Sequence, residues 1–179
     1  MATDIYRPEI WSGFFQLVGT ASAALTGLVF VSMSLNLDII TQDVTHRNRA
    51  IGTLAGLAAI FMACAFAIMG GQNHLAVGAE LLIVSSTAAT IYVHGYLQSL
   101  KQQGSTVGLN YTRITIGASC YAVEIIGALI LTLGHIMGLY IAAAAIILNV
   151  PFLISGVWLL LVGVHQDLTK QQKSRSRKR

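Results

Sequence analysis

Charged residues are scarce in this sequence. Asp, Glu, Lys and Arg together make up 10% of its 179 residues, against about 25% in an ordinary soluble domain. Hydrophobic residues make up 55%, and the mean hydropathy is +0.69. A chain with so little charge lacks the polar surface that a water-soluble core needs, so the composition excludes a soluble globular protein and indicates an integral membrane protein.

Reactive residues and catalytic motifs are also few. The chain has two cysteines, Cys64 and Cys120, and both fall inside apolar runs, so neither a disulfide framework nor a CxxC motif is available. The HExxH, GxSxG, P-loop and Rossmann patterns do not occur in the sequence. We therefore predict that the protein is not an enzyme, with no catalytic residue, no metal site and no cofactor.

Long apolar runs are what the sequence does contain. They predict an all-α, polytopic membrane protein with five transmembrane helices, because about 20 apolar residues cross the hydrocarbon core of a bilayer. The helices form one domain, residues 1–164, with spans at about 13–37, 50–70, 75–97, 114–134 and 139–164. Between them, the polar segments Asp38 to Arg49 and Gln98 to Thr112 are expected to be loops.

Small residues recur every four positions in the first two spans. Gly19, Ala23 and Gly27 follow this spacing in the first span, and Gly52 and Gly56 form a GxxxG motif in the second. Such spacing lets two helices approach closely. These faces exceed what a five-helix bundle has to bury, so we predict a homo-oligomer or a membrane-protein partner.

The first span also carries a resemblance. The segment SAALTGLVFVSMSLNL, from Ser22 to Leu37, resembles the first helix of a family of uncharacterised small multi-pass bacterial membrane proteins, some of which are labelled as protease modulators. The similarity extends from Trp11 to about Ile40. It implies a bacterial membrane protein and assigns no chemistry to any residue. For this all-helical chain we expect the inner membrane.

The basic residues predict the orientation. With the C-terminus in the cytoplasm, only Arg7 of the 11 Lys and Arg residues lies outside. The positive-inside rule therefore predicts that the N-terminus is outside and the C-terminus cytoplasmic.

The tail, residues 165–179, concentrates positive charge. Its six basic residues are Lys170, Lys173, Arg175, Arg177, Lys178 and Arg179. No aromatic residue or folded scaffold accompanies them, and the membrane anchor places them beside anionic lipid, so we expect them to bind lipid rather than nucleic acid.

One acid interrupts the fourth span. Glu124 is 11 residues beyond Arg113, or about 16 Å along a helix, which places it near the middle of the membrane. An acid at that depth faces neighbouring helices or a cavity rather than lipid. Asn149 lies at a similar depth in the fifth span and is the expected hydrogen-bond partner. Pro151 removes a backbone donor and frees a carbonyl near Ile147.

Two interpretations of this polar site stay open. In the first, a hydrogen bond between Glu124 and Asn149 fixes the register of two helices. In the second, Glu124, Asn149 and the carbonyl freed by Pro151 line a cavity for a proton, a cation or a small solute. The polar residues near the outer side, His74, Glu80 and His135, would then lie at its mouth.

Tyr92, His94 and Tyr96 near the end of the third span also have two interpretations, an interfacial belt or a proton-accepting site, and we favour the belt. Taken together, the residues favour a non-catalytic structural or regulatory subunit that acts through helix packing. The alternative is a small oligomeric channel or transporter that uses Glu124 and Asn149.

Overall fold

The structure is a computed structural model that describes residues 6–102 and 107–176. In these residues the chain forms six helices and no strand. The helices are α1 (Pro8–Ser34), α2 (Leu37–Gln42), α3 (Val44–Ile68), α4 (His74–Gln102), α5 (Val107–Thr132) and α6 (Met137–Ser176).

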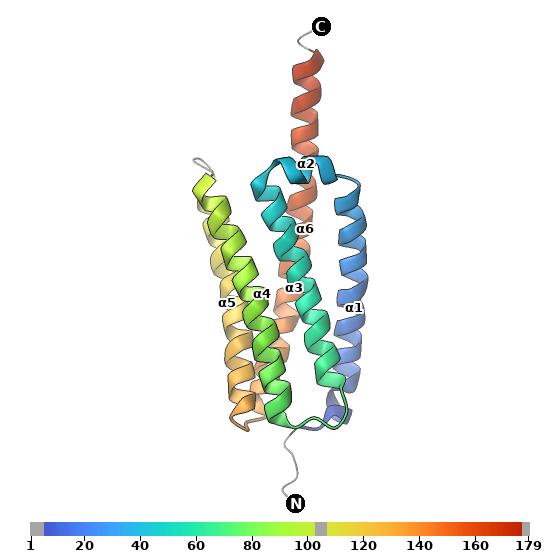
Figure 1. Cartoon of the computed structure of the whole chain (residues 1–179), viewed down its shortest axis with the longest axis vertical. Coiled ribbons are helices and arrows are strands. Elements are labelled where there is room, and N and C mark those ends of the chain that lie inside the picture. The colour runs from blue at the N-terminus through green and yellow to red at the C-terminus, as the bar shows by residue number, and fades with distance from the viewer. Residues whose placement is uncertain (1–5, 103–106, 177–179) are drawn as a thin grey trace, which may run out of the picture.

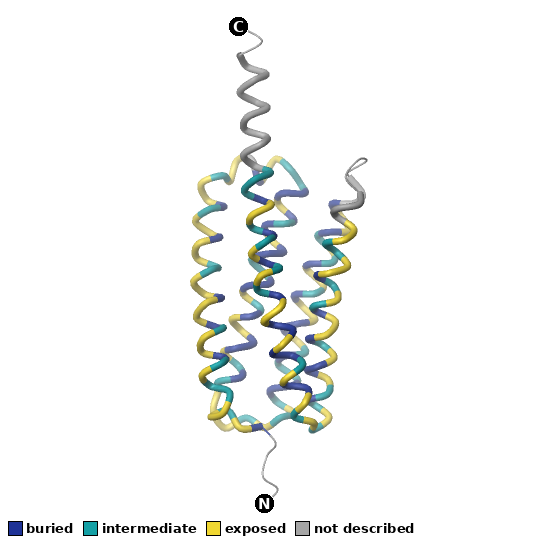
Figure 2. The backbone as a smooth tube through the Cα atoms, turned by 180° about the vertical axis from the view of Figure 1, so that it is seen from behind, coloured by how far each residue is buried: buried dark blue, intermediate teal, exposed yellow. Residues whose placement is uncertain are grey.

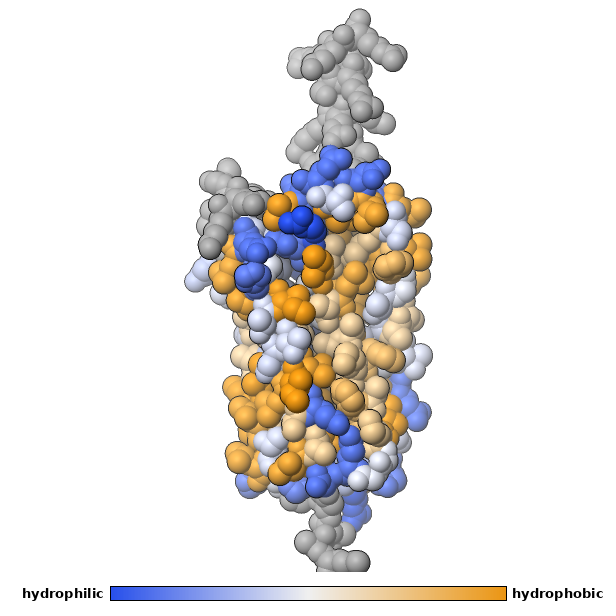
Figure 3. Space-filling view, in the orientation of Figure 1, coloured by the Kyte–Doolittle hydropathy of each residue, from blue (hydrophilic) through white to orange (hydrophobic). Residues whose placement is uncertain are grey.

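Five of these helices, all except α2, are long and apolar enough to cross a membrane. Their outward-facing side chains are largely hydrophobic: Figure 3 shows orange residues over the middle of the molecule and blue residues towards both ends. Figure 2 shows buried residues on the inner sides of the helices and exposed residues on the outer sides. The predicted all-α, multi-pass membrane fold is therefore confirmed.

The long helices run alternately up and down, and α3 is central among them (Figure 1). It packs against α1, α4 and α6, while α5 packs between α4 and α6. The helices α3, α4, α5 and α6 thus form a closed unit, and α1 attaches to it mainly through α3. We call the upper end in Figure 1, where α3 and α5 begin and α4 and α6 leave the bundle, the basic end.

The first predicted loop is largely helical. Residues 37–42 form the short helix α2, and α3 already begins at Val44. Asp43 explains the start of α3, because its carboxylate accepts hydrogen bonds from the backbone N–H groups of Thr45, at 2.7 Å, and His46, at 3.1 Å. A side chain that accepts these otherwise unpaired donors is a helix N-cap. Polarity keeps this segment out of hydrocarbon without preventing it from being helical.

The prediction of a second loop, Gln98 to Thr112, is wrong in the same way, because this polar segment is also largely helical. Helix α4 continues to Gln102 and α5 begins at Val107; the remaining four residues lie outside the described part of the chain. A helix continues past the membrane surface wherever its sequence permits, because water satisfies the polar side chains there.

The predicted packing residues divide into two groups. Gly19, Gly52 and Gly56 are buried inside the chain, whereas Ala23 and Gly27 are exposed. A Cβ atom at Gly19 would lie 3.0 Å from Cβ of Cys64 on α3. Because each step of four residues turns a helix by about 400°, a four-residue stripe drifts around the helix, so α1 presents Gly19 to α3 but not Gly27.

Helices α5 and α6 touch most closely near the end opposite the basic end. A Cβ atom at Gly127 would lie 2.6 Å from the backbone nitrogen of Ala142 and 2.8 Å from the carbonyl oxygen of Gly138. The turn that joins the two helices contains Gly134 with φ of 87°, a backbone conformation that favours glycine. The absence of side chains on both sides brings the two backbones into direct contact.

Helix α6 extends beyond the membrane-spanning part of the molecule. Its sequence is largely apolar and uncharged from Met137 to Val164, and the helix then continues to Ser176 through much of the predicted basic tail. The side chains of Lys170, Lys173 and Arg175 and the whole of residues 177–179 lie outside what the structure describes. The predicted lipid contact of the tail therefore stays a prediction.

Candidate functional site

Glu124 of α5 lies in the interior of the bundle. Its side chain is 3% exposed, and the hydroxyl group of Ser85 on α4 donates a hydrogen bond of 2.8 Å to its carboxyl group. Residues 117, 127, 128 and 131 on the same side of α5 are also buried. The structure thus places Glu124 against neighbouring helices, with Ser85 as a partner that sequence reasoning missed.

Asn149 does not bond to Glu124. It is fully buried on α6, and neither polar atom of its side-chain amide has a hydrogen-bond partner among the described residues. The predicted Glu124–Asn149 hydrogen bond is therefore wrong. The two residues do belong to one polar cluster, because Tyr121 on α5 lies close to both of them.

Tyr121 occupies the space between α5 and the central helix. A Cβ atom at Gly56 would lie 2.7 Å from its hydroxyl oxygen, so the glycine makes room for the phenol. The hydroxyl is buried, and its approach to Asn149 lacks the geometry of a hydrogen bond. Gly56 was predicted to let two helix backbones pack closely; in the structure it leaves space on α3 for the side chain of Tyr121 from α5.

Pro151 is not part of this cluster. The residue is exposed on the outer side of α6, as is Ile147, whose carbonyl it frees. Side chains two residues apart in a helix point in directions that differ by about 200°, so Asn149 faces inwards while Pro151 faces outwards. The prediction that Pro151 contributes to a polar cavity is therefore wrong, and helical geometry explains why.

The polar residues at the far end are separated from Glu124. Glu80 on α4 accepts hydrogen bonds of 2.8 Å from the side-chain amide of Gln72, His74 begins α4, and His135 is exposed in the turn before α6. Between this end and Glu124 lies a layer of fully buried apolar side chains from three helices, namely Val77, Leu81, Ala128, Leu131 and Leu139. His74, Glu80 and His135 therefore do not form the mouth of a cavity at Glu124. No group of three or more His, Cys, Asp or Glu in the described residues could hold a metal ion.

Polar groups continue instead from the cluster towards the basic end. The rings of Tyr121 and Tyr92 are 5.7 Å apart, and those of Tyr92 and Tyr96 are 4.7 Å apart. Tyr92 and Tyr96 are buried, so they do not form an interfacial belt, and only His94 is exposed. The favoured interpretation of these tyrosines was wrong because Gly117 on α5 leaves the space that the Tyr92 ring occupies.

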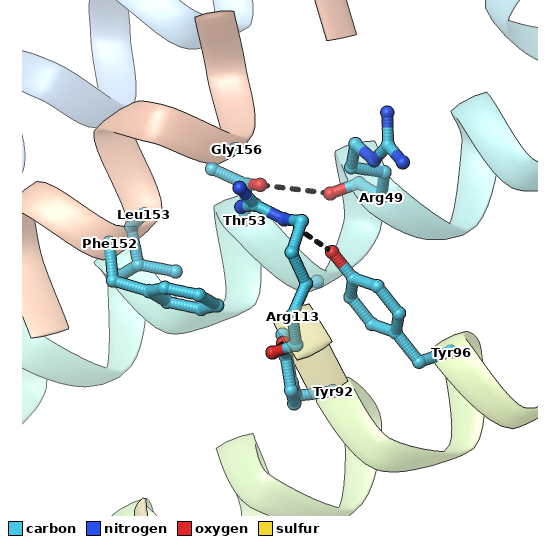
Figure 4. Close-up of a pocket in the computed structure, with 9 residues that line it drawn as sticks. Arg49, Thr53, Tyr92, Tyr96, Arg113, Phe152, Leu153 and Gly156 are labelled. Carbon is cyan, nitrogen blue, oxygen red and sulfur yellow. Dashed lines mark hydrogen bonds between the residues drawn. The ribbon is translucent and has the colours of Figure 1, made fainter. Parts of the chain in front are cut away.

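The tyrosines lead to Arg113, which sequence analysis did not single out (Figure 4). The hydroxyl of Tyr92 donates a 2.8 Å hydrogen bond to the backbone carbonyl of Arg113. The guanidinium group donates to Tyr96 at 3.4 Å and to Ser155 at 3.2 Å, and it lies 5.0 Å from the ring centre of Phe152. An arginine at the start of a span resembles any basic loop residue in sequence, so only the neighbouring helices reveal that it points inwards.

Comparison with protein-family models, with curated proteins and with solved structures finds no match to this chain.

Proposed function

We propose that this integral membrane protein is a non-catalytic structural or regulatory subunit that acts through helix packing, and that its partner is a second copy of the same chain. The observation that carries this proposal is the outer face of α1. Gly13, Gln16, Thr20, Ala23 and Gly27 are all exposed, and they repeat at intervals of three and four residues, the spacing of a helix–helix seam.

This face differs from an ordinary lipid-facing surface. Apart from its own helix backbone, no described part of the chain lies within 4 Å of a Cβ atom built at Gly13 or at Gly27, so neither glycine packs against another described helix. Small residues permit two backbones to approach, whereas lipid contact does not require them. Gln16 adds a polar amide that is poorly solvated by hydrocarbon and can bond to its equivalent in a second α1.

The experiment measures self-association of the purified chain in liposomes by energy transfer between labelled copies. We expect the wild type to associate, and Ala23→Leu or Gly27→Leu to weaken association at least about tenfold, because one added side chain separates the two backbones. Ala21→Leu makes the same change at an exposed position off the face and should leave association unchanged. Equal association of Ala23→Leu and wild type would contradict the proposal.

The polar cluster supports a second candidate, a small channel or transporter for a proton, a cation or a small solute. The observation in its favour is that Asn149 and Tyr121 bury polar atoms without hydrogen bonds among the described residues, which is costly unless they serve a ligand. Glu124→Gln separates the candidates. A structural site tolerates the amide, whereas a path for protons or cations needs a titratable group, so transport into liposomes would be abolished only under the second candidate.

The cellular context stays part of the proposal. The resemblance of the first helix supports a bacterial membrane, which for an all-helical chain is the inner one, and the distribution of Lys and Arg supports a cytoplasmic location of the basic end.

A further inference from the structure

A small cavity lies at the basic end between α3, α4, α5 and α6. Its volume is about 10 Å³, and its lining includes Arg49, Thr53, Tyr96, Arg113 and Gly156. This is about the space of one water molecule or of one oxygen atom of a larger group. In Figure 4 the Arg113 side chain extends into the space between Tyr96 and Thr53, while the guanidinium group of Arg49 points away from it.

Arg113 has donors to spare in this cavity. A guanidinium group has five N–H donors, and the hydrogen bonds of Arg113 to the described residues, those to Tyr96 and Ser155, use two of them. A Cβ atom at Gly156 would lie 3.3 Å from one terminal nitrogen of Arg113 and 3.2 Å from the hydroxyl of Thr53. The unused donors therefore border the space that the missing side chain of Gly156 leaves open.

No described carboxylate neutralises this cation. The sequence has seven Asp and Glu. Glu124 bonds to Ser85, Glu80 bonds to Gln72, and Asp43 caps α3. Glu9 stands at the start of α1, and Asp38 is exposed on α2; Asp4 and the Asp167 side chain lie outside the described part. A half-buried guanidinium without a carboxylate is a site for an external anion.

The depth of the cavity indicates the source of that anion. Arg113 directly precedes the apolar run of α5 that begins at Ile114, so it lies at the boundary between hydrocarbon and headgroups, where lipid phosphates are found. Figure 3 shows a notch with hydrophilic residues between the upper end of α4 and the end where α2 and α3 meet. The helices α3 and α4 on either side of this notch both contribute residues to the lining of the cavity. Basic pockets between transmembrane helices are known to take anionic headgroups in this way.

We propose that the cavity binds a phosphate oxygen of an anionic phospholipid, with Arg113 as the donor. This site is separate from the basic tail and needs only the membrane location of the chain, not the subunit role. Inorganic phosphate and a phospholipid headgroup would offer the same phosphate oxygens to this cavity. We assign the phosphate to a lipid because the cavity lies at headgroup depth.

The test is a titration of the full chain in neutral detergent micelles, with thermal unfolding as the readout. The probes are phosphatidylglycerol, phosphatidylcholine and inorganic phosphate, since a ligand that binds the folded state raises the unfolding midpoint. We expect stabilisation by phosphatidylglycerol and about tenfold weaker binding in Arg113→Gln, because charged hydrogen bonds are lost. Arg47→Gln removes one exposed charge at the same end and should bind as the wild type does.

Gly156→Ala provides a second variant that retains every charge. Its added methyl group fills the cavity, so it should also weaken phosphatidylglycerol binding. Equal weakening by Arg47→Gln and Arg113→Gln would overturn the proposal in favour of general surface charge. If inorganic phosphate, but not phosphatidylglycerol, gave an Arg113-dependent stabilisation, the ligand would not be a lipid. If both Gly156→Ala and Arg113→Gln bound phosphatidylglycerol as the wild type does, the cavity would not be the binding site.

Discussion

Two buried tyrosines on facing helices, Tyr92 and Tyr121, differ in how their hydroxyl groups are bonded. Tyr92 donates to the backbone carbonyl of Arg113 at 2.8 Å, whereas the hydroxyl of Tyr121 has no hydrogen bond among the described residues. A buried polar group without a partner costs about 1–3 kcal/mol. The same chemical change at the two positions should therefore have opposite effects on stability.

We predict that Tyr121→Phe stabilises the protein by about 1 kcal/mol, because it removes an unpaired buried hydroxyl, and that Tyr92→Phe destabilises it by a similar amount. The free energy of unfolding in mixed micelles would be compared for the two variants and the wild type. Destabilisation of Tyr121→Phe as large as that of Tyr92→Phe would mean that the Tyr121 hydroxyl is hydrogen-bonded in the membrane.

The same residues show how far the site could be predicted. Glu124 was predicted to face inwards because an isolated acid in an apolar run has no other stable position, and it does. The outward position of Pro151 relative to Asn149 follows from helical geometry and could have been predicted. The Ser85 partner and the inward turn of Tyr92 and Arg113 could not, because they depend on which helices become neighbours and where a glycine such as Gly117 leaves room.

At the scale of single helices, the start of α3 depends on one side chain. Asp43 accepts two backbone hydrogen bonds there. Partial burial alone would raise the pKa of this carboxyl, but the backbone bonds from His46 and Thr45 and the nearby His46 ring outweigh it, so the pKa is lowered below its ordinary value of 3.8. The folded state thus holds the charged form more strongly than the unfolded chain does.

We predict that Asp43→Ala destabilises the protein by about 1 kcal/mol at neutral pH through loss of the cap. In the wild type, the unfolded chain binds the proton more readily, so the contribution of Asp43 is complete above about pH 4 and is lost as the pH falls further. Unfolding measured against pH would show this.

Asp43→Asn is the matched control, because asparagine also caps a helix but does not titrate there. It should keep most of the stability and lose this part of the pH dependence. If the wild type and Asp43→Asn fell equally with pH, the cap would not be the titrating group.

Helix existence was easier to predict than helix length. Five apolar runs predicted the five long helices, since each run has the length that the membrane requires. Their ends were misplaced because hydropathy marks where a segment leaves hydrocarbon, not where its backbone hydrogen bonds stop. The short helix α2 and the extension of α4 to Gln102 are both polar segments that remain helical outside the apolar layer.

For the whole molecule, the interior is divided along its length. In the half near the basic end, a series of polar side chains extends through space from Glu124 past the tyrosines to Arg113. Tightly packed apolar side chains such as Leu81 and Leu131 fill the other half. This unequal division was beyond sequence analysis, because each helix alone is apolar along most of its length and the division emerges only when four helices are brought together.

The backbone contact of α5 with α6 at Gly127 has a mechanical consequence. The two helices cannot approach further at this contact, and the short turn between Thr132 and Met137 holds them together at the same end, so a relative movement becomes a rotation about that point. Arg113 lies 14 residues away along α5, or about 21 Å. A tilt of about 5° around this pivot would displace the backbone of Arg113 by about 2 Å. A small rotation at Gly127 would therefore widen the cavity at Arg113 by close to the size of a water molecule.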